Sequence, residues 1–289
     1  MRPVILAAAF RMRGVIMSVI SLLVTDEDVK QKPRDIGIML RKLFLPFGGS
    51  DVYFDAGRTV FLLDLLLPAD NESGVNFDLR LAYALAELAR GKDARSVSFA
   101  VRPEEGFDLE QVLRVSGYDQ LRQLENVDFI DLSRCETVQL PTDTGLALDS
   151  AAVYRPLAEA GLVISLAKLK AAENSLFGSA MNNLALATPD LAGLTAEQRG
   201  RALTDVYSVL APDLTVVDGW RGDAGFQQHR GDFVMAAADA VAADAVLAAL
   251  SGLDLAEVDY LQLAAQYGLG EGDPGNIHLY GDDIGDLMN

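Results

Sequence analysis

Two lysines directly follow an apolar run and have the spacing that could bind an anion. Lys168 and Lys170 come after residues 162–166, which are expected to form a buried strand. Residues two apart in an extended segment point to the same side, so both ammonium groups are expected to face one site. A helix is expected over residues 174–187, and its N-terminal end would add positive charge there. The pattern predicts a corner that binds carboxylate or phosphate; the alternative is a solvated strand end that carries lysines.

A carboxylate follows a second apolar run in the same way. Asp218 comes after an expected strand over residues 214–217 and precedes a glycine-rich loop, residues 219–231. Such a carboxylate can be a metal ligand or a general base, and His229 and Asp223 in the loop could complete a site of oxygen and nitrogen ligands. The alternative is a solvated loop histidine. We therefore assign no metal site and no cofactor, and a divalent ion remains the weaker alternative.

The two groups of residues are expected to share one edge of a sheet. The ends of parallel strands emerge together, so the lysines and Asp218 should line one cleft, within about 15 Å of each other. The competing interpretation is that Asp218 and one lysine only form an ion pair that closes the sheet edge.

A second pair of carboxylates belongs to an alanine-rich helix expected over residues 239–249. Asp239 is expected to be its N-cap. Asp244 lies about 140° away around the helix, so these two carboxylates do not share a face. An unpaired buried carboxylate is costly, so Asp244 is expected to pair with Lys168 or Lys170.

Apolar and amphipathic stretches alternate along the chain and must position these residues. Repeated alternation of strand and helix predicts an α/β fold with a mainly parallel sheet and helices on both faces. One domain is expected over residues 26–282, with a soft division near 141–150. Residues 1–25 are expected to be an N-terminal extension, with alternative starts at Met12 and Met17, and 283–289 an acidic tail. The expected strands cover residues 58–67, 96–101, 127–132, 162–166, 214–217 and 277–280, and the expected helices 28–47, 76–90, 108–124, 174–187, 195–210 and 239–249.

The charge of the chain disfavours some partners. Acidic residues outnumber basic ones 42 to 24 in 289 residues, which gives a formal net charge of −18. Such a surface repels nucleic-acid phosphates and anionic lipid, so neither is an expected partner. Residues 14–24 imitate the apolar part of a signal peptide, but no cleavage pattern follows and the run is too short to cross a bilayer. A cytoplasmic protein is expected; its oligomeric state is not indicated.

A single cysteine limits the metal chemistry of one chain. Cys135 cannot form an intrachain disulfide, and an iron–sulfur cluster is typically held by four thiolates. We therefore expect no iron–sulfur cluster. A buried, structural cysteine is expected at this position, with a nucleophilic thiol as the alternative.

Two blocks of sequence resemble the DUF362 family, whose function is largely unassigned. Gly161-Leu-Val-Ile-Ser-Leu-Ala-Lys-Leu-Lys170 and Ser175-Leu-Phe-Gly-Ser-Ala-Met-Asn-Asn-Leu184 are similar to the family's "D-x-I-I-N-L-P-K-L-K-T-H" and "G-A-L-K-N-L-F-G". These two stretches form the first block. The second block lies closer to the C-terminus and is similar to "V-V-D-G", "D-P-V-A-V-D-A-V-A", "G-L-G" and "V-x-G". Its elements here are Val217-Asp218-Gly219, residues 239–247, Gly268-Leu-Gly270 and Leu279-Tyr-Gly281. The resemblance covers roughly residues 50 to 282.

The departures from the family pattern define two hypotheses. Lys170-Ala171-Ala172 replaces Lys-Thr-His, Asn182-Asn183 replaces Lys-Asn, and Leu63-Asp64-Leu65 replaces Lys-Pro-Asn. The first hypothesis is a small-anion-binding protein of the DUF362 type, in which no reaction and no catalytic residue is assigned. The second is a non-catalytic binding or assembly module that keeps the fold. An iron–sulfur redox protein is opposed by the single cysteine. The predicted ligand-binding residues are Lys168, Lys170, Asn182, Asn183, Asp218, Asp244 and His229.

Overall fold

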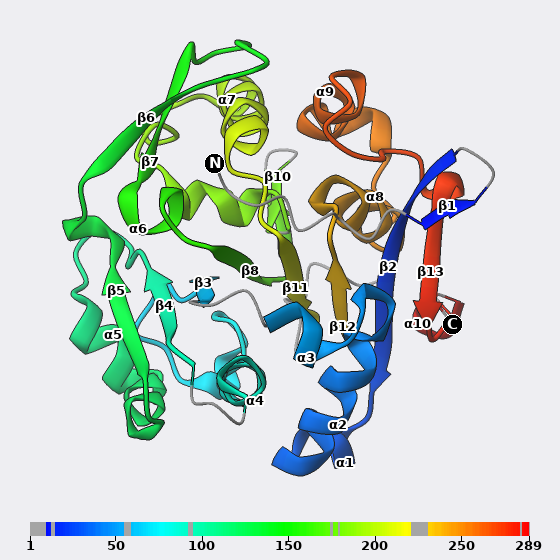
Figure 1. The fold of residues 1–289 in the computed structure, drawn as a ribbon. Coiled ribbons are helices and arrows are strands. Elements are labelled where there is room, and N and C mark those ends of the chain that lie inside the picture. The colour runs from blue at the N-terminus through cyan, green and yellow to red at the C-terminus, as the bar shows by residue number, and fades with distance from the viewer. Residues whose placement is uncertain are drawn as a thin grey trace.

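A single large sheet organises the chain (Figure 1). The computed structural model describes residues 10–12, 15–54, 59–91, 95–173, 176–178, 180–220, 231–283 and 285–288. Among these residues nine strands form the sheet, in the order β1-β2-β12-β11-β8-β3-β4-β5, with β13 beside β2. The strands are β1 (Phe10–Met12), β2 (Val15–Thr25), β3 (Thr59–Leu63), β4 (Val97–Val101), β5 (Val127–Asp131), β8 (Leu162–Lys168), β11 (Leu214–Asp218), β12 (Asp232–Ala237) and β13 (Ile277–Gly281).

Most of this sheet is parallel. The strands β11, β8, β3, β4 and β5 pair in parallel, and β13 is parallel to β2. Only β12 and β1 introduce antiparallel pairs, β12 with β11 and β2, and β1 with β2. The predicted fold class, an α/β fold with a mainly parallel sheet and helices on both faces, is confirmed.

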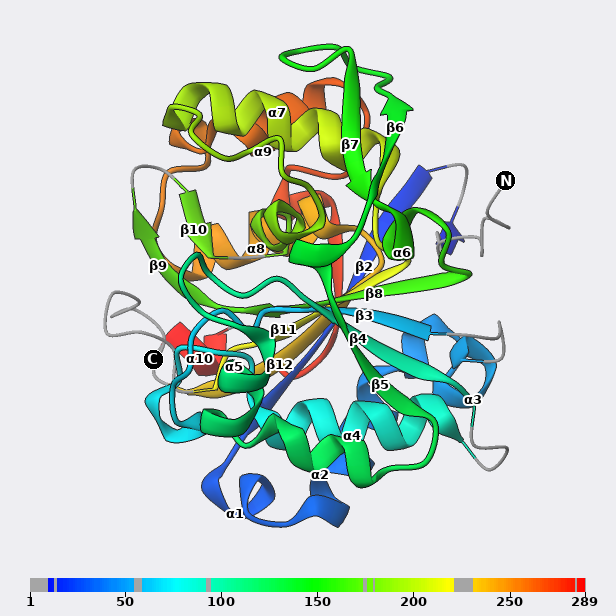
Figure 2. The ribbon, with the colours of Figure 1, turned by 90° about the vertical axis from the view of Figure 1, so that its left-hand side faces the viewer.

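Helices cover both faces of the sheet (Figure 2). In β3, Val60 and Leu62 pack into one apolar cluster, whereas Phe61 and Leu63 pack into the other. A strand buried on both faces reads as a continuous apolar run, which is why β3 is recognisable in the sequence. One face carries α2 (Pro33–Leu43), α3 (Ser50–Tyr53), α4 (Leu79–Arg90) and α5 (Leu109–Val115), and the other α6 (Arg155–Ala158), α7 (Ala196–Val209), α8 (Ala240–Leu250) and α9 (Asp259–Gln266).

Local signals in the sequence explain several helix ends. The stretch predicted as one helix over 28–47 is divided into α1 (Glu27–Lys30), α2 and a 3-10 turn, η1 (Leu45–Phe47), and α2 begins at Pro33. Gly117, with a φ of 74°, separates α5 from the 3-10 helix η4 (Tyr118–Gln123). The predicted caps of α7 and α8 are confirmed: Thr195 forms a capping box with Gln198, and Asp239 caps α8.

The predicted helix over residues 174–187 is wrong. The chain after Lys168 forms a hairpin of β9 (Lys170–Glu173) and β10 (Leu176–Gly178), and only a 3-10 helix, η6 (Asn182–Ala187), follows. Buried side chains hold the segment in this form through the contacts given below. Without a regular helix here, the predicted contribution of a helix dipole to an anion site is also wrong.

The predicted outer segments contribute to the sheet and its surroundings. Residues 15–25, assigned to an N-terminal extension, form β2, between β12 and the pair β1 and β13.

The predicted division near 141–150 is the turn of a hairpin between β6 (Thr137–Pro141) and β7 (Ser150–Tyr154). Its loop is bound by the buried carboxylate of Asp205, which accepts the N–H groups of residues 146–148 at 2.7–2.8 Å. In the predicted acidic tail, Gly285–Met288 form α10 and Leu287 is buried.

None of the helices within the described ranges is both long and apolar enough to cross a membrane.

Candidate functional site

Charged side chains gather where the parallel strands end. Lys168 and Asp218 are the last residues of β8 and β11, and they are directly paired in the register of these neighbouring strands. Because β12 runs antiparallel to β11 and β2, its first residue, Asp232, and the last residue of β2, Thr25, lie at the same edge. The carboxyl edge therefore also receives α1, which follows β2 in the chain.

Lys168 and Asp218 form a fully buried ion pair. The Nζ–Oδ2 distance is 3.0 Å, and the exposed fractions of the two side chains are 1% and 0%. The ammonium group also donates to the carbonyl oxygen of Trp220. Asp218 accepts hydrogen bonds from the backbone N–H of Asp78 at 2.7 Å and that of Trp220 at 2.8 Å. The shared-edge argument thus places the two groups correctly, but in the closed ion pair that was the competing interpretation.

Burial dominates the proton affinity of Asp218. Removal from water raises the pKa of this carboxyl group, the ammonium of Lys168 lowers it, and the carboxylate of Asp78 raises it; the net direction is upward. The ammonium of Lys168 and the two backbone N–H groups therefore oppose the cost of burying this carboxyl group.

Lys170 has a different partner from Lys168. Its Nζ lies 2.6 Å from Oδ1 of Asp64, just beyond the end of β3, while the other oxygen of Asp64 accepts the backbone N–H of Lys168 at 3.2 Å. Since β8 lies between β3 and β11, the two lysines reach to opposite neighbours. Lys170 retains 27% side-chain exposure, against 8% for Asp64. Asp64, the middle residue of the segment that corresponds to the family's Lys-Pro-Asn, is thus part of the site.

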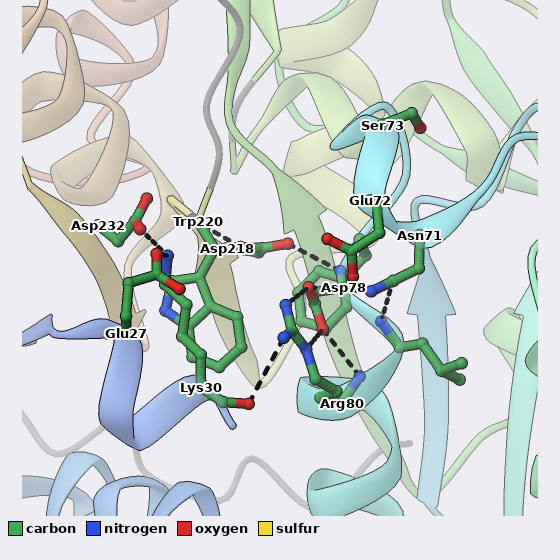
Figure 3. A network of polar contacts seen from close by, with 12 residues as sticks. Glu27, Lys30, Asn71, Glu72, Ser73, Asp78, Arg80, Asp218, Trp220 and Asp232 are labelled. Carbon is green, nitrogen blue, oxygen red and sulfur yellow. Dashed lines mark hydrogen bonds and ion pairs between the residues drawn. The ribbon is translucent and has the colours of Figure 1, made fainter. Parts of the chain in front are cut away.

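A second set of ion pairs continues from Asp218 along the edge (Figure 3). Asp78 pairs with Arg80 at 2.7 Å, and Lys30 pairs with Glu27 at 2.8 Å and with Asp232. The buried ring of Trp220 lies between the two cations, 5.3 Å from Cζ of Arg80 and 5.8 Å from Nζ of Lys30. Cations over an indole face are attracted by its electrons, so the ring holds α1 against the start of α4.

Beside this network is a cavity of about 720 Å³, between α1, α4 and η4. Lys30, Arg80 and Glu87 line it together with the apolar side chains of Ile36 and Leu79. The two cations at its wall are already paired with Asp232 and Asp78, so their charges stabilise the wall itself.

Asp244 and Asn183 organise the segment that follows the hairpin. Asp244, fully buried in α8, accepts the backbone N–H groups of Ala180 and Met181 at 2.8 and 3.0 Å and the hydroxyl of Tyr260 at 3.1 Å. The predicted pairing of Asp244 with a lysine is wrong, because backbone donors and a tyrosine take that place and both lysines pair elsewhere.

The amide of Asn183 ties η6 to the sheet. Its Nδ2 donates to Oγ of Ser165 at 2.8 Å and to the carbonyl oxygens of Leu62 and Leu166 at 3.2 Å. Asn183 is 5% exposed, whereas the neighbouring Asn182 is half-buried. These bonds to strand ends, with those of Asp244, fix the short 3-10 helix.

The remaining candidates divide into exposed, structural and undescribed residues. His229 and Asp223 lie outside the described residues, and His278 is exposed on β13. Within the described parts of the chain, no three His, Cys, Asp or Glu residues are grouped so as to hold a metal ion. Cys135 donates from Sγ to the carbonyl oxygen of Asp131 at 3.2 Å, and burial and Asp131 raise the pKa of its thiol. A raised pKa makes a cysteine a poor nucleophile at neutral pH.

Several site residues were missed by the sequence reasoning. Asp64 interrupts an otherwise apolar run over 59–67, which is a visible signal for a polar role. Asp78 is the N-cap of α4, two residues after the start of the helix expected over residues 76–90. Lys30, Arg80 and Trp220 carry no spacing signal, because the contacts among them and with Asp232 join residues 50 to 202 apart and depend on the sheet order.

The family model for "Domain of unknown function (DUF362)" matches residues 63–249. This chain belongs to the DUF362 family. The match begins at the last residue of β3, includes β8 and β11 and ends within α8, and it therefore includes Asp64, Lys168, Asp218 and Asp244. A comparison with curated proteins gave no match.

Two solved structures are similar to the DUF362 chain at low identity. One is the lactate racemase apoprotein from Thermoanaerobacterium thermosaccharolyticum, with 12% identity, a TM-score of 0.40, and coverage of 69% of this chain and 50% of that one. The other is a crystal structure of a protein from Thermotoga maritima, with 12% identity, a TM-score of 0.42, and coverage of 81% and 59%. The chain thus spans between half and three fifths of these proteins.

Proposed function

We propose that the DUF362 chain binds a small anionic molecule at the carboxyl edge of its sheet, with Lys170 as the cation that contacts the ligand. The observation that carries this proposal is the difference between the two edge lysines. Lys168 is buried and gives two of its N–H donors to Asp218 and Trp220. Lys170 is partly exposed and, among the described contacts, gives one of its three donors, to Asp64. Two donors of Lys170 are therefore available to a carboxylate or phosphate.

In this proposal the buried residues form the rigid frame of the site. Asp64 binds both Nζ of Lys170 and the backbone of Lys168, so it orients the accessible lysine against the buried pair. Asn183 links the same strand ends to η6. A preorganised cation loses little freedom when it meets a ligand, and this favours binding.

A thermal-shift titration tests the role of Lys170. Inorganic phosphate and acetate are added to the whole chain at constant ionic strength, and Lys170→Met is compared with Lys42→Met, whose parent side chain is exposed on α2. Lys170→Met is expected to lose the part of the anion-induced rise in the melting temperature that comes from this site, and Lys42→Met to keep the whole rise. The apo form of Lys170→Met is expected to lose stability as well, because Asp64 is buried and loses its counter-charge, so the anion-induced rise is measured against the apo melting temperature of each variant. Equal stabilisation of both variants by the anion would contradict the proposal.

A non-catalytic binding or assembly module is the second candidate, and it is favoured by how the polar residues of the family-like blocks are used. Lys168, Asn183, Asp218 and Asp244 all make internal contacts that hold strand ends and η6 together. If this function is correct, no anion changes the melting temperature of the chain, while Lys168 and Asp244 variants lose stability.

A further inference from the structure

A separate cavity lies at the end of β4 and contains two arginines. It has a volume of about 240 Å³ and is lined by residues just beyond the carboxyl ends of β3 and β4, by the segment after η6 and by α7. Arg102 directly follows β4, and Arg199 belongs to α7. Leu66 and Leu191 supply apolar wall. Strand β4 is two strands away from β8 in the sheet, a distance of about 10 Å, so this cavity is distinct from the site proposed around Lys170.

Arg102 is fixed in place but is not neutralised. Its Nη1 donates to the carbonyl oxygens of Ala185 at 3.1 Å and Thr188 at 2.9 Å, and its Cζ lies 6.0 Å from the ring centre of Tyr154. None of these partners carries a negative charge. The guanidinium is therefore held in one orientation by neutral groups, with its charge directed at the cavity that it lines.

Arg199 faces the same cavity with an unused donor. Its Nε is buried and has no hydrogen-bond partner within the described structure. Burial and the positive charge of Arg102 both lower the pKa of this guanidinium. Arg201, two residues further along the same helix, instead pairs with Glu197 at 3.3 Å. Among the described contacts, neither Arg102 nor Arg199 has a carboxylate partner, although the chain contains 42 acidic residues.

The two glutamates at this cavity do not balance the arginines. Glu104 and Glu105 line it, but no oxygen of either lies within ion-pair distance of Arg102 or Arg199 among the described contacts. Placing like charges together and leaving a buried N–H unsatisfied both cost free energy, and an anion between the arginines would remove both costs. Guanidinium groups bind carboxylate and phosphate through paired N–H donors.

We propose that Arg102 and Arg199 form a binding site for a compact oxyanion, the carboxylate or phosphate group of a small molecule. The volume suits a ligand of only a few non-hydrogen atoms beyond that group, since each water-sized unit occupies about 30 Å³. Glu104 and Glu105 at the wall disfavour a second negative charge on the ligand and favour a hydroxyl or ammonium group there. This site is additional to the proposed Lys170 site and does not rest on it.

Calorimetric titration with inorganic phosphate and with acetate tests the arginine site. Arg199→Gln removes the charge and is expected to weaken binding of the anion at least about tenfold, the loss of one charge-assisted hydrogen bond. Arg201→Gln, on the same helix, is the matched control and should bind as the unchanged chain does. Arg199→Lys keeps the charge without the planar fork and should bind with intermediate affinity. Preference for acetate or for phosphate identifies which oxyanion is bound.

A stability measurement separates this proposal from a merely structural role of Arg199. Without the anion, Arg199→Gln should melt at or above the temperature of the unchanged chain, because an unpaired and repelled charge is removed. Lys170→Met removes the other proposed site, so anion binding that remains in Lys170→Met and is lost in Lys170→Met/Arg199→Gln supports the site at the arginines. Equal binding in Lys170→Met and the double variant, or the absence of binding of both anions to the unchanged chain, would overturn it.

Discussion

Replacing Lys168 by methionine tests the buried ion pair most directly. Methionine is close to lysine in length and volume, so it fills the same space without leaving a large cavity. It leaves Asp218, which is 0% exposed, with two backbone N–H donors and no counter-charge. Removing one partner of a buried pair typically costs about 3–5 kcal/mol. We expect a loss of this size in the free energy of unfolding at about pH 7.

The loss should depend on pH in a direction that follows from the pKa of Asp218. Burial already raises this pKa in the folded protein, and Lys168 opposes the rise. Without Lys168 the folded-state pKa is higher still, so the variant's loss of unfolding free energy is full above that pKa and shrinks as the pH falls from it toward the folded-state pKa of the unchanged protein. Stability changes of other carboxyl groups are common to both proteins and cancel in the difference.

Urea unfolding followed by tryptophan fluorescence measures the difference in the free energy of unfolding between the Lys168→Met variant and the unchanged chain. Trp220 is the only tryptophan, is fully buried, and accepts a hydrogen bond from Lys168 at its carbonyl oxygen. The double variant Lys168→Met/Asp218→Asn carries no unpaired charge and should recover part of the loss. A single-variant deficit below about 1 kcal/mol, or one that is the same at about pH 5 and about pH 7, would refute the reasoning.

Three further predictions concern the packing around the site. Tyr260→Phe removes one donor from the buried carboxylate of Asp244 and should lower the free energy of unfolding by about 1–2 kcal/mol, measured by urea unfolding; an unchanged midpoint would show the bond to be dispensable. Gly270→Ala would place a Cβ against Asp239 Oδ1 and within 2.6 Å of the Val241 Cβ, so its melting temperature should fall, corresponding to about 1–3 kcal/mol. Alkylation of Cys135 by iodoacetamide should be slower than that of free cysteine, with a rate still rising above the pKa of an ordinary thiol; a plateau near neutral pH would contradict the raised pKa.

The sequence predicted those parts of the fold that depend on local pattern. Buried parallel strands are continuous apolar runs, so β3, β8 and β11 could be located from composition alone. The parallel arrangement then placed Lys168 and Asp218 at one edge. Capping side chains identified the starts of α7 and α8 because their hydrogen bonds are made within a few residues.

Features that depend on tertiary contacts could not be predicted in this way. The residues of β9 and β10 are equally compatible with a helix, and the hairpin is selected by bonds from Asp244 and Asn183, which lie outside it. The apolar run of β2 beside two arginines resembles a targeting segment until its partners β12 and β13 are known. Lys170 pairs with Asp64 and Lys168 pairs with Asp218, and these partners can be predicted only when the strand order is known.

The position of β2 has a consequence for the folding of the chain during synthesis. Its partner residues in β12 and β13 follow it by about 200 to 260 residues, as in the pairs Thr25 with Asp232 and Ser18 with Ile277. At about 5–20 residues per second, an emerging chain waits roughly 10 s or more for the first of these partners. During that time an eleven-residue apolar strand has exposed edges on which another chain could pair. Contacts so distant in sequence also form slowly, so closure of this side of the sheet is expected to be a late step, at which chaperones would protect the nascent protein.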